Sequence, residues 1–204
     1  MMRTEKEMYH MIMQIAKEDE RIRAVYMNGS RTNKNVENGI LPDIPEATDE
    51  GYYVRKPTRE QFLCTCTEFW WCLNNVAKGL WREEILYVQD MINFCVRKQL
   101  EKVLSWKVGI KTNFSVSVGK SAKYMYKWLQ QEEYDEYLST YAAGNTQDCW
   151  RAVFKMTSLF SAIAKNVAEE LGYVYNSEEE KACIDFLHIV CELPKDAEEV
   201  VTNK

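Results

Sequence analysis

After residue 58, apolar residues recur at spacings of three and four, which is the period of an amphipathic helix. Thr58 and Gln61 form a capping-box pattern in front of such a run. We therefore expect a helix from about 59 to 78, with Gly79 as a break or a point of close packing. A second long helix is expected from about 81 to beyond 106.

Shorter helices are expected at about 121–130 and 132–142 after a break at 113–118, and then a long helix at about 146–171. Gly172 stands where a left-handed glycine often ends a helix. Ser177 and Glu180 form a further capping-box pattern for a last helix that reaches about Glu192. Residues 58–192 are thus predicted to form a helical bundle, with a frayed tail at 193–204.

The N-terminal part has a different pattern. Thr4 and Glu7 predict the capped start of an amphipathic helix that ends near Glu20. Residues 22–28 predict a short strand that runs into a tight turn at 28–31, and residues 32–57 predict an irregular linker. A single strand has no ladder partner, so this one would either expose an edge or pair with another chain, for example in a homodimer. The apolar stripe of the first helix should likewise dock on the bundle or on a second copy.

Composition narrows the class of protein. The net charge of −5 and the pI near 5.3 argue against a general nucleic-acid binder and suit a cationic ligand. Seven cysteines, an odd number without a recognisable targeting segment, indicate reduced thiols in a cytoplasmic protein. Cys64 and Cys66 lack the second pair that would complete four zinc ligands. No apolar run approaches the roughly 18 residues of a membrane span, so no membrane partner is expected.

Two groups of residues are candidates for binding phosphate. A strand ahead of Gly29, Ser30 and Arg31 offers backbone amides and a hydroxyl to an anion, although such a sequence is also an ordinary turn. Lys107 and Lys111 are four residues apart and share one helix face. The more common role of such lysines is a solvated helix face, and the functional alternative is a triphosphate clamp.

A second candidate site combines carboxylates with tryptophans. Glu68 and Glu84, interleaved with Trp70 and Trp81, would suit a polycationic sugar, because aromatic faces cover apolar patches and attract ammonium groups. The alternative is that the carboxylates are solvated and the tryptophans belong to the core. The sequence pattern leaves both alternatives open.

Several stretches closely resemble the aminoglycoside 6-adenylyltransferases, the streptomycin-modifying enzymes. The N-terminal ones are TEKEM at 4–8, AKEDERIRAV at 16–25 and MNGSR at 27–31. The later ones are PEATD at 45–49, YYV at 52–54, EFWW at 68–71, VAKGLWR at 76–82, LSWKVGIK at 104–111, SVGK at 117–120, VAE at 167–169 and LGY at 171–173. The resemblance covers nearly the whole chain except about 32–44 and the last twenty or so residues.

The resemblance implies a mainly α fold, with the helical bundle preceded by a short helix–strand remnant (1–31) of an α/β nucleotidyltransferase domain. It implies ATP and Mg²⁺ as cofactors, and an aminoglycoside such as streptomycin as substrate. A drug hydroxyl would attack the α-phosphorus of ATP, and pyrophosphate would leave. From the chemistry of these family-matching positions, we expect Gly29, Ser30 and Arg31 to hold the nucleotide, with Lys107 and Lys111 assisting.

The chain departs from the family at the metal site. The family has an Asp-x-Asp pair on the strand after Gly-Ser-Arg, whereas this chain continues with Thr32 and reaches the helical part within about 25 residues. Its acids there are not in that spacing: Asp43, Glu46, Asp49 and Glu50. We therefore expect no metal site and no catalytic residue. Three hypotheses remain: an impaired adenylyltransferase, a non-catalytic module that binds drug or nucleotide, or a protein that dimerises through strand 22–28.

Overall fold

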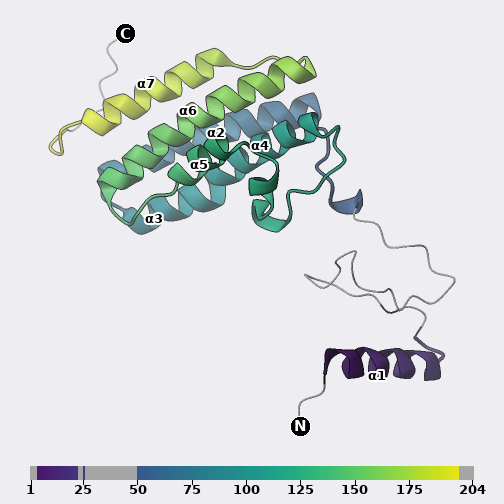
Figure 1. Cartoon of the computed structure of the whole chain (residues 1–204). Coiled ribbons are helices and arrows are strands. Elements are labelled where there is room, and N and C mark those ends of the chain that lie inside the picture. The colour runs from purple at the N-terminus through teal and green to yellow at the C-terminus, as the bar shows by residue number, and fades with distance from the viewer. Residues whose placement is uncertain (1–3, 23–24, 26–49, 198–204) are drawn as a thin grey trace. The chain divides into compact units, whose positions relative to one another are not determined.

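The structure is a computed structural model of the chain, and it describes residues 4–22, 25 and 50–197 (Figure 1). It divides into two compact units, Met1–Ala47 and Thr48–Lys204, which are described separately. In the first unit, α1 (Glu5–Glu18) begins at the expected capping box. The backbone N–H of Thr4 donates to Glu7 Oε2 at 2.7 Å, and that of Glu7 donates to Thr4 Oγ1 at 3.3 Å. The first predicted helix is confirmed.

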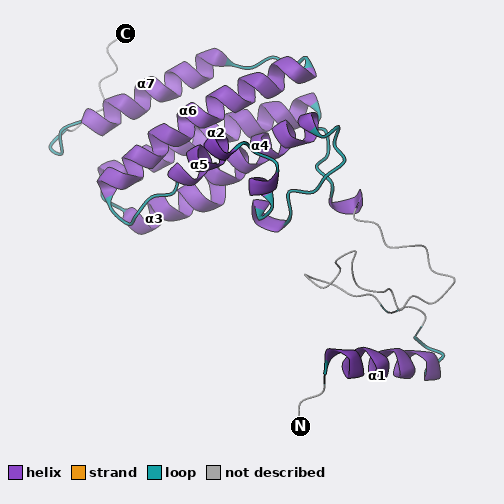
Figure 2. Ribbon diagram, viewed as in Figure 1, coloured by secondary structure: helices purple, strands orange, loops and turns teal. Residues whose placement is uncertain are grey.

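The strand expected at 22–28 is not supported. Only Ile22 and Val25 of that stretch are described, and neither belongs to a strand. The described residues form helices joined by loops and contain no strand (Figure 2). An isolated strand lacks a partner for its backbone hydrogen bonds, which is the physical difficulty with that expectation. The turn at 28–31 and most of the linker lie outside the described residues.

The second unit begins with a short 3₁₀ turn, η1 (Glu50–Tyr52), and the long helix α2 (Arg59–Trp81). The capping box of α2 is present as predicted, since Gln61 N donates to Thr58 Oγ1 and Thr58 N to Gln61 Oε1. The helix continues through Gly79 and turns only at Arg82–Glu84. A Cβ at Gly79 would lie 2.8 Å from Val88 Cγ2, so this glycine allows close packing and does not break the helix.

The second long helix starts later than predicted and has three parts. These are α3 (Ile85–Asp90), the π-helical segment η2 (Met91–Val96) and α4 (Arg97–Lys111). Glu83, with φ of 62°, lies in the turn that separates α3 from α2. The sequence pattern placed the start at 81 because Trp81 is apolar, although it completes the preceding helix.

Residues 112–130 form an irregular connection where a regular helix at 121–130 was expected. Only two 3₁₀ turns occur there, η3 (Lys120–Ala122) and η4 (Met125–Lys127). The helix expected at 132–142 is α5 (Gln131–Ser139). The apolar period at 121–130 misled the prediction, because Met125 and Leu129 are buried without belonging to an α-helix.

The last two helices agree closely with the sequence pattern. They are α6 (Thr146–Leu171) and α7 (Ser177–Glu192), and Gly172 ends α6 with φ of 69°. The cap of α7 differs, because Asn176 Oδ1 accepts from Glu179 N, and Ser177 is already helical. Glu180 instead contacts α6, where it accepts from Ser161 and pairs with Lys165 at 2.8 Å.

One apolar core joins the helices of the second unit. α2 packs on α4, α6 and α7, and α4 also packs on α6, so these four helices lie side by side (Figure 1). The rings of Phe69 and Phe160 are stacked with centroids 3.6 Å apart, and Trp70 meets Phe160 edge-on at 5.6 Å. None of the described helices combines the length and apolar character needed to cross a membrane.

Candidate functional site

The predicted nucleotide residues fall in two different places. Gly29, Ser30 and Arg31 lie outside the described residues. Lys107 and Lys111 occupy the last two turns of α4, and both face the connection to α5. Lys107 forms an ion pair with Glu133 of α5, and Lys111 Nζ donates to the carbonyl oxygen of Trp128 at 3.5 Å.

The two lysines belong to a longer cationic stretch. In a chain of net charge −5, residues 102–131 contain six lysines and no acidic residue. We call this stretch the lysine segment. The ammonium groups of Lys123 and Lys127 lie 4.8 and 4.7 Å from the centroid of one ring, that of Tyr124. Helical spacing points to Lys107 and Lys111 but does not reveal this set, whereas a scan for windows without acidic residues would find it.

The backbone of the lysine segment is strained at several points. Asn113, Phe114, Ser121 and Ala122 all have φ between 52° and 56°, a left-handed conformation that residues other than glycine adopt rarely. Gly119 also has a positive φ, 74°, which glycine adopts without this cost. Strained non-glycine residues cost on the order of 1–3 kcal/mol each and cluster at ligand-binding sites and switch regions. The strain therefore singles out this segment from the regular helices around it.

A cleft of about 570 Å³ opens between α2 and α4. Glu68 lines it from α2, whereas Lys102 and Trp106 line it from α4. The remaining lining residues are Arg55, Gln61, Cys64, Thr65 and Gln99. Two cations therefore face one carboxylate, together with amide, hydroxyl and indole groups. This set can hydrogen-bond a sugar-like ring, but its charge does not by itself favour a polycation.

The four residues expected to face a drug are not brought together. Trp70 is 1% exposed and part of the core. Trp81 stands thirteen residues beyond Glu68 on α2, about 20 Å along the helix axis at 1.5 Å per residue. Its indole N–H donates to Leu193 O at 3.3 Å, and Glu84 is an exposed residue at the start of α3. Of the four, only Glu68 lines the cleft.

The cysteines form no metal cluster in the part of the chain that the structure describes. All seven are free thiols, and no three His, Cys, Asp or Glu side chains among the described residues gather closely enough to hold a metal ion. Burial, with a smaller contribution from Glu179, raises the pKa of Cys66 and Cys183 to about 12. These two side chains therefore stay protonated and act as core residues.

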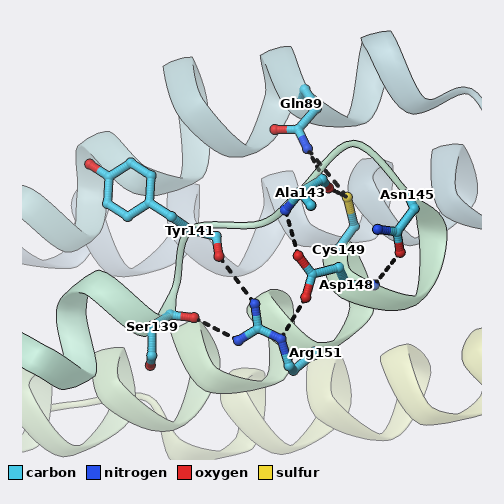
Figure 3. Close-up of polar contacts among 8 residues, drawn as sticks. All are labelled: Gln89, Ser139, Tyr141, Ala143, Asn145, Asp148, Cys149 and Arg151. Atoms are coloured by element: carbon cyan, nitrogen blue, oxygen red, sulfur yellow. Dashed lines mark hydrogen bonds and ion pairs between the residues drawn. The ribbon is translucent and has the colours of Figure 1, made fainter.

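A polar network closes the loop that joins α5 to α6 (Figure 3). Asp148 accepts from the backbone N–H of Ala143 at 2.5 Å and from Arg151 Nε at 2.7 Å. Arg151 also donates to the carbonyl oxygens of Ser139 and Tyr141, at 2.9 and 3.2 Å. The hydrogen bonds to Asp148 lower its pKa, first through the side chain of Arg151. Every partner is within the fold, so the network holds the loop in place.

Known proteins agree with this architecture. A family model described as streptomycin adenylyltransferase matches residues 2–44 and 37–190. Such a model defines a class of nucleotidyl-transferring proteins. Because the matched segments cover most of the sequence, the chain belongs to the streptomycin adenylyltransferase family.

Individual relatives carry a more specific name. The aminoglycoside 6-adenylyltransferase of Bacillus subtilis (strain 168) is 36% identical over 132 residues, which is 65% of this chain and 46% of the relative. That of Campylobacter jejuni is 37% identical over 142 residues, 70% of this chain and 49% of the relative. The chain thus spans about half the length of the curated relatives it matches.

A solved structure gives the same result. The crystal structure of an aminoglycoside 6-adenyltransferase from Bacillus subtilis superimposes with a TM-score of 0.64 at 30% sequence identity. The superposition covers 74% of this chain and 57% of that one. The expected family is therefore confirmed.

Proposed function

We propose that this protein is an aminoglycoside 6-adenylyltransferase-like protein in which transfer of AMP from ATP to a streptomycin-class hydroxyl is impaired. The support for the ancestry is the family match and the name of the relatives. The support for the impairment is the sequence, which has no Asp-x-Asp pair after Gly29-Ser30-Arg31. Without carboxylates to hold magnesium, the charge on the transferring phosphoryl group is not neutralised, and losses of many powers of ten in rate are expected.

We further propose that the helical unit still binds a nucleotide. The lysine segment would bind its triphosphate group. The observation that carries this proposal is the acid-free run of six lysines in an acidic chain. Lysine ammonium groups are strongly charged point donors that suit phosphate oxygens. Lys107 and Lys111 lie one turn apart on α4, and Lys123 and Lys127 both lie close to the Tyr124 ring in the connection that follows.

An assay of pyrophosphate release tests the impaired AMP transfer independently of the proposed binding role. The assay uses ATP and magnesium with and without streptomycin, beside a full-length relative. We expect no drug-dependent release from this chain while the relative is active. Efficient release would overturn the impairment and require a catalytic centre rebuilt from other acids or from a second chain.

Direct binding tests the nucleotide site. ATP titrated calorimetrically at low salt should bind to the unmodified chain, and K123A/K127A should weaken binding by about tenfold for each cation lost, since a hydrogen bond to a charged group contributes roughly 1.5–3 kcal/mol. Lys155→Ala is the matched control, because Lys155 is an exposed lysine of α6 outside the lysine segment. If both variants weakened ATP binding equally, the binding would come from the general surface charge and not from a site in the lysine segment.

For the drug we propose Glu68 as the carboxylate that faces an aminoglycoside amine in the α2–α4 cleft. Trp81 and Glu84 would then form a separate surface at the other end of α2, and Trp70 would act only through the core. A thermal-shift series with streptomycin should show a shift that Glu68→Gln removes and Glu84→Gln leaves in place. The absence of any shift at millimolar drug would remove this proposal.

A structural role is favoured by one observation in the first unit. The apolar side chains of Met8, Ile12 and Ile15 in α1 are 44%, 39% and 52% exposed. We propose that residues 1–31 join two copies of the chain. Light scattering should then show a dimer that becomes a monomer when these residues are deleted, and an unchanged monomer would reject the idea.

A further inference from the structure

One carboxylate already occupies the lysine segment. Glu133 lies in the first turn of α5, two residues after the end of the acid-free run, and it forms the ion pair with Lys107. The side chains of Lys107 and Glu133 are 31% and 29% exposed, so both are partly removed from water. Glu133 is also part of the α5 capping box, where its Oε2 accepts from Gln130 N at 3.4 Å. The carboxylate is thus held over the end of α4 by its own helix.

The electrostatics keep Glu133 ionised. Partial burial opposes its charge, but the hydrogen bond and charge of Lys107, the Gln130 backbone and the charge of Lys111 together lower the pKa of Glu133. At neutral pH the group is therefore a carboxylate that both lysines attract. It already pairs with Lys107, one of the two cations that the proposed phosphate site would use.

We propose that Glu133 is a built-in competitor for the phosphate site at Lys107 and Lys111, so that only an anion with several charges binds there. This inference rests on the proposed nucleotide site. A monovalent anion would exchange one ion pair for another and leave Glu133 without its partner. An oligophosphate can displace the carboxylate from Lys107 and also reach Lys111, one helical turn further along α4. Glu133 therefore determines the class of ligand: oligophosphates, such as the triphosphate of a nucleotide, and not single phosphates.

Displacement of the carboxylate leaves α5 intact. The capping bond from Gln130 N does not involve Lys107, and the position of Glu133 near the N-terminus of a helix favours its negative charge in either arrangement. The exchange thus needs a side-chain rotation and no unfolding. This makes Glu133 a positioning residue for Lys107 and not a group that touches the reacting atoms.

The substitution Glu133→Gln tests the proposal directly. Glutamine keeps the shape of the side chain and an oxygen that can accept from Gln130 N, but it removes the charge that holds Lys107. We expect calorimetric titration with inorganic tripolyphosphate at low salt to show binding about tenfold tighter than in the unmodified chain, since a charged partner contributes on the order of 1.4 kcal/mol or more. Inorganic orthophosphate should bind to Glu133→Gln measurably and to the unmodified chain not at all.

The neighbouring acid supplies the control. Glu132→Gln removes the same charge one position earlier, from an exposed side chain that has no ion pair with Lys107. We expect it to change tripolyphosphate affinity by less than twofold. Equal tightening by both substitutions would overturn the inference in favour of general repulsion. Unchanged affinity in Glu133→Gln, with the unmodified chain binding, would overturn it and leave the nucleotide site standing. No binding by either protein would overturn both proposals.

Discussion

Helices α1 and α2 begin in nearly the same way and end in very different surroundings. Each starts with a threonine whose hydroxyl accepts a hydrogen bond from the backbone N–H of the third helical residue, Glu7 or Gln61. The side chain of that residue in turn accepts a hydrogen bond from the backbone N–H of the threonine. α2 then buries one whole side against α4, α6 and α7. α1 leaves Met8, Ile12 and Ile15 more than a third exposed within its described surroundings. Capping and period thus specify a helix, but they do not supply the partner that covers it.

The difference shows where the stability of the fold originates. A short isolated helix is marginal in water, because forming its first turn costs more conformational entropy than one hydrogen bond returns. Most helical stability in proteins comes from packing of the apolar face. α2 has that packing in the aromatic cluster around Phe160, whereas the described residues of the first unit offer α1 nothing comparable. The two regions should therefore respond differently to matched substitutions.

Truncation of an apolar side chain should give the largest contrast. Phe160→Ala removes a ring that is 0% exposed and stacked on Phe69, and we expect it to lower the free energy of unfolding by about 3–5 kcal/mol. Ile12→Ala in α1 should lower it by less than about 0.5 kcal/mol. Urea unfolding monitored by tryptophan fluorescence reports on the bundle alone, because all six tryptophans lie between residues 70 and 150. Comparable losses would show that α1 packs against the bundle.

Removal of the two caps should give an intermediate contrast. Thr58→Ala exposes the first backbone amides of α2 and should cost about 1 kcal/mol, because a capping side chain contributes roughly that much. Thr4→Ala removes the same bond from α1 and should leave the fluorescence-detected transition of the bundle unchanged. A shift of the urea midpoint in both variants would show that the stability of the bundle depends on the cap of α1.

The effect of low pH on the free energy of unfolding should differ least between substitutions in the bundle and in α1. Burial acts to raise the pKa of Glu180, but hydrogen bonds from Lys165 and Ser161 outweigh it and lower that pKa. Hydrogen bonds from the backbone and side chain of Thr4 lower the pKa of Glu7. A lowered pKa in the folded state stabilises the fold above the ordinary glutamate pKa, and this contribution disappears as pH falls through the folded value.

We therefore expect Glu180→Gln to cost about 0.5 kcal/mol at pH 7, since ion pairs of this exposure contribute that amount, and to cost less at pH 3. Glu7→Gln should leave the bundle transition unchanged at both pH values. Urea titrations at the two pH values measure this. A cost of Glu180→Gln that is as large at pH 3 as at pH 7 would mean that packing, and not charge, is responsible.

The sequence predicts the ends of helices where these ends depend on neighbouring residues only. The capping boxes at Thr4 and Thr58 and the left-handed Gly172 each depend on residues within one helical turn, and all three were predicted correctly. The cap of α7 was placed one residue late, because Asn176 and Ser177 are both good capping residues. Only the bond from Glu179 N to Asn176 decides between them.

The candidate site was less predictable because its determinants are distant in sequence. Trp70 and Trp71 are adjacent and chemically identical, yet one is 1% and the other 67% exposed. Only the packing of α7 and α6 on α2 determines which of them is buried. The partner of Lys107 lies 26 residues away, beyond an irregular connection whose path no periodicity describes. The sequence shows that the lysine segment is rich in lysine and lacks acidic residues, but it does not show which contacts these lysines make.

The π-helical segment at Met91–Val96 should allow the fold to tolerate the deletion of one residue there, in evolution or by engineering. A π turn contains one residue more than an α turn, so it absorbs an insertion without rotating the helix beyond it. Before the segment, Val88 meets Gly79 of α2; after it, the buried guanidinium of Arg97 donates to Thr140 Oγ1 at 2.6 Å. Loss of one residue between 91 and 96 would convert the turn to α and keep both contacts. The same loss within α4 would rotate every later side chain by about 100°.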